Sequence, residues 1–232
     1  MTEHVKRQSF KEAFIDAIPV IVGYVFVGIA FGLMLYENGF SFWWAILSSL
    51  IVYAGSLQFV LISFMATGAS LLTVALTTLS VNSRHLFYGI TFLDLFKRMG
   101  KLKPYMIFTL SDETYSLMAI ALKKGGKDNS YYFFVSIINQ SFWIIGSFLG
   151  GVMGEVIPFN TEGIDFAMTA LFTVIFIEQW LSSKSKAPGI MGLVLGLGFL
   201  LIMKSSGFIM PALVAASILL LLFGFREEWS FL

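Results

Sequence analysis

Long unbroken apolar stretches constrain this chain more than any other feature of its sequence. A bilayer core of about 30 Å is crossed by roughly 20 apolar residues in a helix, whereas barrel strands need only about 9–11 alternating residues. The stretches are continuous, which favours helices. They predict an all-α integral membrane protein, a polytopic helical bundle of about 7–8 transmembrane segments that includes discontinuous or re-entrant ones. The stretches cover 15–35, 42–66, 70–95, 104–121, 131–157, 166–181, 188–203 and 208–225.

Composition excludes the soluble classes of protein. Apolar residues make up 57% of the chain and charged residues 12%, about half the charged share of a soluble domain. This excludes an ordinary cytosolic enzyme, a nucleic-acid binder and a disordered chain. The chain has no cysteine, and its two histidines, His4 and His85, are far apart. We therefore expect no disulfide, metal site or cofactor.

The connections between the stretches are short, so residues 1–232 are expected to form one transmembrane domain. The polar segment 1–14 carries Lys6, Arg7 and Lys11 and precedes what we interpret as a retained first span. Lysine and arginine concentrate on the side of the membrane where the N-terminus lies, which predicts a cytoplasmic N-terminus. The basic loop 97–103 fits this orientation only if stretch 70–95 returns to the side from which it enters. Loop 122–127 then moves outside unless stretch 104–121 also makes no full crossing, so either one basic loop is an exception or both stretches fail to cross.

Several charged residues occur inside apolar stretches. Arg84 and His85 lie within stretch 70–95, and Asp112 and Glu113 within stretch 104–121. A charge at bilayer depth costs at least about 2.5–3.5 kcal/mol, and such residues usually face an internal cavity. Apolar flanks keep these side chains from reaching the interface. They are therefore candidates for function.

The spacing of the polar residues predicts stripes on several helices. Residues three, four and seven apart share a helix face, so helices with such stripes are expected to converge around a hydrated path. The predicted stripes are Thr109, Asp112, Glu113 and Ser116, then Ser136, Asn139, Gln140, Trp143 and Ser147, and finally Thr78, Asn82 and His85.

The charged groups suit a zwitterionic substrate. Arg84 offers a fork of donors to a carboxylate, and the adjacent carboxyl groups of Asp112 and Glu113 suit proton exchange. A purely structural ion pair between Arg84 and one acid is the simpler interpretation. It leaves the second acid without a partner. For His85, a proton relay and a structural role remain open.

Residues 53–59, with the sequence YAGSLQF, interrupt stretch 42–66 with small and polar side chains. Gly55 permits either a helix break whose backbone groups bind a ligand or close helix packing, and both remain open. Three sets of glycines at four-residue spacing are interpreted as helix-packing faces. They are Gly28 and Gly32, then Gly146, Gly150 and Gly154, and finally Gly192 and Gly196.

Three motifs in order resemble the AzlC family, the large subunit of bacterial branched-chain amino acid exporters. They are YAGSLQF at 53–59, RHLFYG at 84–89 and LSDE at 110–113, within a resemblance that extends from residue 17 to about 123. The resemblance implies export of valine, leucine, isoleucine and perhaps methionine, driven by the proton-motive force. It also implies a small hydrophobic partner subunit of the AzlD type.

The leading hypothesis is a secondary transporter that exports apolar amino acids. Arg84, Gln58, Ser56, Asn82 and Asn139 would bind the substrate. Proton coupling or binding of the amine would fall to Asp112, Glu113 and His85. The alternative is a channel or pore for small solutes, although no selectivity-filter motif is present. An enzyme is not expected, because no nucleophile motif accompanies Ser56 or Ser83. A homo-oligomer remains open.

Overall fold

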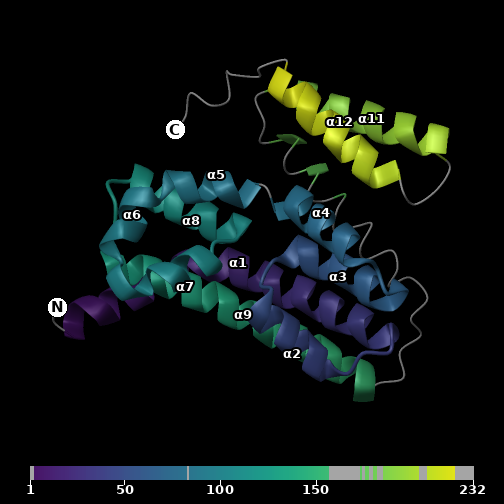
Figure 1. Ribbon diagram of the computed structural model, residues 1–232. Coiled ribbons are helices and arrows are strands. Elements are labelled where there is room, and N and C mark those ends of the chain that lie inside the picture. Colours follow the sequence, from purple (N-terminus) through teal and green to yellow (C-terminus); the bar gives the residue numbers. More distant parts are fainter. Residues whose placement is uncertain are drawn as a thin grey trace. The chain divides into compact units, whose positions relative to one another are not determined.

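The computed structural model describes residues 3–82, 84–156, 173, 176–177, 180–181, 185–203 and 208–222. Every element among these residues is a helix, so the predicted all-α class is confirmed (Figure 1). The number of membrane crossings stays a prediction. The helices are α1 Glu3–Glu37, α2 Phe42–Ile51, α3 Gly55–Thr67, α4 Leu71–Asn82, α5 Arg84–Thr91, α6 Leu93–Arg98, η1 Gly100–Leu102, α7 Lys103–Phe108, α8 Asp112–Lys123, α9 Asn129–Val156, α11 Ala187–Met203 and α12 Ile209–Leu222.

The chain divides into two compact units, which are described separately. The first comprises Met1–Ala69 with Val81–Met168, and the second Ser70–Ser80 with Thr169–Leu232. In the second unit α11 and α12 pack against each other. The predicted span 166–181 lies almost entirely outside the described residues.

Two long helices, α1 and α9, form the framework of the first unit and pack along each other (Figure 1). Val5–Glu37 and Asn129–Val156 are the two described segments that are long and apolar enough to cross a membrane unaided. Glycines allow their close approach: a side chain at Gly32 would overlap the Ser147 carbonyl oxygen, and one at Gly150 would overlap that of Ile29. The packing interpretation is therefore confirmed for α1 and α9.

The glycines of α11 differ from those of the framework helices. A Cβ atom added at Gly192 or Gly196 would meet nothing within 4 Å among the described residues. The packing interpretation is therefore not supported for this third set.

Three of the predicted stretches are interrupted. Stretch 42–66 forms α2 and α3, which are separated at Tyr53, where φ is +37°. Stretch 104–121 forms α7 and α8, and stretch 70–95 forms α4, α5 and α6. The predicted discontinuity is confirmed. The prediction of one helical stripe through Thr109 and Asp112 is wrong, because α8 begins only at Asp112.

The basic loops on either side of α7 and α8 lie at the same end of the first unit. The Asn129 side chain donates to the Arg98 carbonyl oxygen (3.2 Å), and Lys127 pairs with Glu12 of α1 (2.7 Å). This hydrogen bond to Glu12 raises the pKa of the exposed Lys127 ammonium. Stretch 104–121 therefore enters and returns at the end that carries the N-terminal half of α1.

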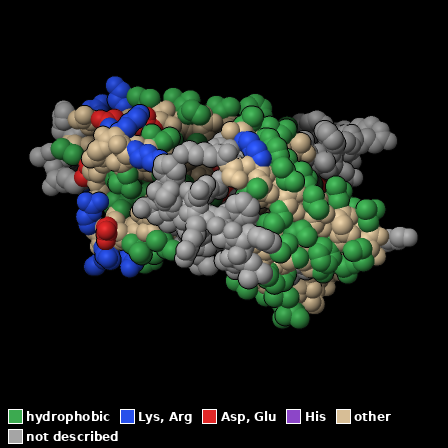
Figure 2. Space-filling model, turned by 90° about the horizontal axis from the view of Figure 1, so that it is seen from above, with side chains coloured by type: hydrophobic (Ala, Val, Ile, Leu, Met, Phe, Trp, Pro, Cys, Tyr) green, Lys and Arg blue, Asp and Glu red, His purple; other side chains and the backbone are tan. Residues whose placement is uncertain are grey.

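Apolar side chains cover much of the described surface (Figure 2), as expected of a protein whose solvent is lipid. Phe26 is 70% exposed and Trp43 66% exposed. The buried side chains of the first unit gather between α9 and the helices around it. One cluster comprises Ala13, Ala17, Phe92, Leu95, Phe96, Met99, Met106, Leu110, Met118, Ala121, Tyr131, Tyr132, Val135 and Ile138.

Candidate functional site

The two interruptions of the first unit face each other in its interior. The Tyr53 ring, from the break between α2 and α3, lies 6.2 Å from the Phe108 ring at the break between α7 and α8. Trp143 of α9 adjoins both breaks. Its ring lies 5.2 Å from that of Tyr24, and it occupies the space where a side chain at Gly55 would lie. A helix break in lipid is tolerated only where the freed backbone is buried in protein or lines a cavity.

Hydroxyl groups organise the second interruption. The Ser111 hydroxyl caps α8 by accepting from the Thr114 backbone N–H (3.2 Å), as N-cap serines commonly do. Tyr24 of α1 donates to Glu113 Oε2 (2.6 Å) and shares a hydrogen bond with Ser111 Oγ (2.7 Å). Asp112 and Glu113 occupy the first turn of α8, where the helix dipole favours negative charge.

The predicted polar stripe of α9 is confirmed as a buried face. Asn139 is completely buried, and its Nδ2 donates to Thr114 Oγ1 (3.0 Å), which joins α9 to α8. The Tyr105 hydroxyl donates to Gln140 Oε1 (2.8 Å), which joins α9 to α7. This helix face therefore lies against both halves of the second interrupted segment.

The first interruption is closed by a different network. Trp143 Nε1 donates to Gln58 Oε1 (2.9 Å), and Gln58 Nε2 donates to Ser49 Oγ (3.1 Å). Ser49 in turn donates to Ser147 (2.9 Å). Gln58 is fully buried, and protein groups engage both ends of its amide. In this arrangement Gln58 fixes Trp143 and α2 in place. Ser56 lies half-buried on the first turn of α3.

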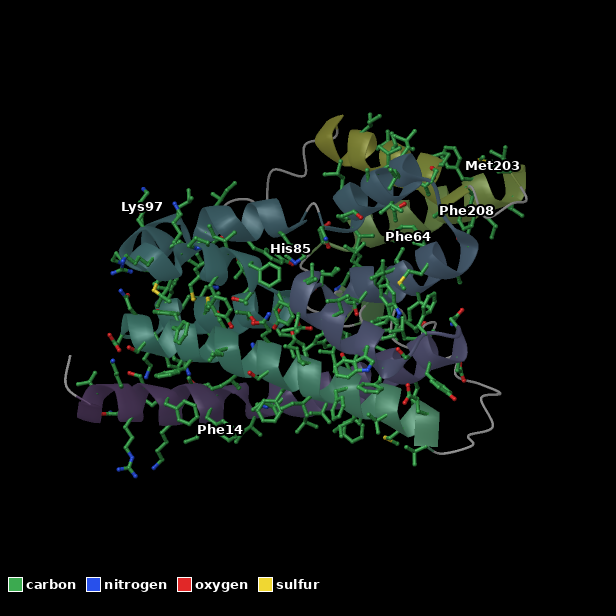
Figure 3. All side chains as sticks on the ribbon, turned by 60° about the horizontal axis from the view of Figure 1, so that its bottom comes forward. Phe14, Phe64, His85, Lys97, Met203 and Phe208 are labelled. Atoms are coloured by element: carbon green, nitrogen blue, oxygen red, sulfur yellow. The ribbon has the colours of Figure 1, made fainter. Side chains whose placement is uncertain are left out.

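The structure brings four predicted site residues to the interruptions, namely Gln58, Asp112, Glu113 and Asn139. Ser56 lies on the helix that begins at the first one. Asn82 and His85 lie instead at the junction of α4 and α5, where His85 Nδ1 is 3.2 Å from the Asn82 carbonyl oxygen. Figure 3 shows His85 at the inner end of α5, away from Lys97.

Arg84 begins α5, but its side chain lies outside what the structure describes. Its predicted pairing with Asp112 or Glu113 stays a prediction. α5 does reach α8, because Tyr88 stacks on Tyr115 with ring centroids 4.4 Å apart.

Sequence reasoning assigned no site role to Tyr24, Tyr53, Ser111, Thr114 or Trp143. Trp143 lies in the predicted stripe, and Tyr53 and Ser111 lie in the quoted motifs, but Tyr24 and Thr114 were missed altogether. Tyr24 and Tyr53 are polar-tipped aromatic residues in the middle of apolar stretches, which is the signal that would have found them. In the described part of the chain, no group of three metal-ligating side chains lies together.

The fold and the site define a helical membrane protein with a buried polar centre at two helix breaks. Residues 19–157 match the family model AzlC protein. The chain is 40% identical over 218 residues to the branched-chain amino acid transport protein AzlC of Bacillus subtilis. The aligned region covers 91% of this chain and 86% of the Bacillus subtilis protein. It therefore belongs to the AzlC family.

Other relatives are also membrane proteins. An uncharacterized membrane protein of Haemophilus influenzae is 38% identical over 92% of this chain and 88% of its own length. The inner membrane protein YgaZ of Escherichia coli is 28% identical over 75% of this chain and 73% of its own length. No solved structure matches the chain.

Proposed function

We propose that this chain is the large subunit of a two-component secondary transporter that exports branched-chain amino acids, with coupling to the proton-motive force. The name of the Bacillus subtilis relative supports the substrate class. The observation that carries the proposal is the meeting of two interrupted helices at a polar centre, where buried hydroxyl and amide groups adjoin the half-buried Asp112 and the exposed Glu113. Discontinuous helices of this kind form substrate sites near the midplane in other transporters.

The proposed roles follow the chemistry of the side chains. Arg84 binds the substrate carboxylate through its fork of donors, and Asp112 or Glu113 binds the amine or exchanges protons. Ser56, Asn82 and Asn139 line the path, and Gln58 acts by holding Trp143. His85, whose ring lies 5.5 Å from that of Tyr88, is the proposed proton-exchanging residue of α5.

The proposed assembly is a complex with a small hydrophobic subunit of the AzlD type in the bacterial cytoplasmic membrane. The N-terminus is cytoplasmic. The gathering of basic loops beside the N-terminal half of α1 supports this orientation, because cytoplasmic loops are rich in lysine and arginine.

Efflux of radiolabelled valine from preloaded vesicles tests the proposal, with both subunits present. Arg84→Ala and Asp112→Asn are expected to abolish most efflux. Arg98→Ala and Asp94→Asn, at two exposed residues of α6, are the matched controls and should export normally. Saturable, pH-dependent flux supports a transporter. Flux that rises linearly with the gradient, or normal export by both site variants, contradicts these assignments.

A further inference from the structure

Three buried oxygen atoms near the breaks have no hydrogen-bond partner among the described residues. They are Tyr53 Oη, Ser136 Oγ and Asn139 Oδ1. Ser136 and Asn139 are completely buried, and Tyr53 is 6% exposed. In a membrane interior an unsatisfied polar group is costly, because no lipid group replaces its lost hydrogen bond. Buried acceptors without a partner therefore point to a ligand.

Two of these atoms belong to one cluster around Thr114. Asn139 Nδ2 is held by Thr114 Oγ1, so Asn139 Oδ1 remains as an oriented acceptor. The Tyr53 hydroxyl lies close to the hydroxyls of Tyr24 and Thr114, but neither contact has the full geometry of a hydrogen bond. The left-handed backbone at Tyr53, costly for a residue with a side chain, directs its ring from the first break toward the second.

The charge near this cluster is negative. Glu113 is exposed at the start of α8, and its carboxylate adjoins the cluster by accepting a hydrogen bond from the Tyr24 hydroxyl. A carboxylate and an amide oxygen only accept hydrogen bonds, so they suit a cationic donor and repel a carboxylate. A primary ammonium has three N–H donors and no acceptor, and its hydrogen bonds to ionised acceptors are the stronger kind.

We propose that Tyr53 Oη, Asn139 Oδ1 and the Glu113 carboxylate bind the ammonium group of the transported amino acid. This subsite rests on the proposed transport function and specifies which end of the substrate faces α8. Thr114 and Ser111 are positioning residues, because they orient Asn139 and Tyr24 without contacting the ammonium.

Tyr53→Phe is the most direct test, because it removes one oxygen that makes no hydrogen bond in the structure. Valine and 3-methylbutanoate, which is valine without its amino group, compete for efflux from vesicles that contain the full chain and its small subunit. The variant is expected to raise the KM for valine roughly tenfold or more, as befits one hydrogen bond to a charged group. Its preference for valine over 3-methylbutanoate should fall by the same factor. Tyr36→Phe, near the far end of α1, should change neither value.

Asn139→Asp and Asn139→Leu extend the test. The aspartate keeps an oxygen acceptor and should retain valine transport, whereas the leucine variant should lose it while remaining in the membrane. An unchanged KM for Tyr53→Phe overturns the subsite, and so does an equal loss of affinity for both compounds. Failure of the unsubstituted protein to transport valine overturns the transport function itself. These outcomes are therefore distinguishable.

Discussion

Each of the two helix interruptions leaves polar groups that need hydrogen-bond partners, and the two breaks provide these partners differently. At the first, α3 begins after Ala54, which provides no side-chain cap, and the first turn carries no acidic residue. Side-chain amide, indole and hydroxyl groups from α2, α3 and α9 satisfy one another there. At the second, Ser111 caps α8, and Asp112 and Glu113 follow immediately.

This difference separates structure from chemistry. The network at the first break consists of neutral buried groups that satisfy one another, so its role is to hold Trp143 and α2 in position. The second break places carboxylates beside hydroxyl groups, and buried acceptors without partners lie next to it. Charge that changes during transport is therefore expected at the second break. Substitutions in the network of the first break should affect stability more than substrate binding, whereas Tyr53 points toward the second break and is expected to act on binding.

The largest expected effect on stability comes from Gln58→Leu at the first break. The substitution leaves the Trp143 indole N–H without an acceptor and removes the donor to Ser49. At about 1–3 kcal/mol for each buried group without a partner, we expect a loss of about 2–4 kcal/mol. Thermal unfolding in detergent measures it. Gln8→Leu, an exposed glutamine on α1, should stay within about 0.5 kcal/mol. Equal melting temperatures for both variants would show that the network contributes little.

Ser111→Ala tests the second break and should have a smaller effect on stability. Loss of an N-cap hydroxyl costs about 1 kcal/mol, and Tyr24 also loses a partner. Because Tyr24 then orients Glu113 less well, valine efflux should weaken more than stability does. Ser111→Thr keeps a hydroxyl and should restore both properties. A variant that loses stability but exports valine at the normal rate contradicts a functional role for this cap.

Ala54→Ser should have the smallest effect, and of opposite sign. A serine at this N-cap offers an acceptor for the first-turn backbone N–H groups of α3, which should stabilise the protein by about 0.5–1 kcal/mol. Valine efflux should remain near normal if the first break is purely structural. The same thermal and efflux assays measure both quantities. A strong loss of efflux would show that these N–H groups contact the substrate, and would make the two breaks functionally alike.

Local pattern predicted much of the site. The stripe on α9 was visible in sequence because a helix repeats every 3.6 residues and α9 is unbroken from Asn129 to Val156. The same reasoning failed for Thr109 and Asp112, because a break removes the periodicity on which it depends. Tyr24 was missed because its importance comes from contacts with residues about 90 positions away along the chain, at Ser111 and Glu113.

The sequence by itself determined that this is a helical membrane protein with costly charges inside its apolar stretches, because composition and hydropathy act locally and require no partner. It also allowed a break at Gly55, where small and polar residues interrupt an apolar stretch, but gave no sign of the break before Asp112. Only the tertiary structure decided that the two breaks meet, that stretch 104–121 returns to the end it started from, and that Tyr24 and Asn139 join its carboxylates. Those outcomes depend on how α1 and α9 pack, and the glycine contacts that set this packing bring together residues far apart in the chain.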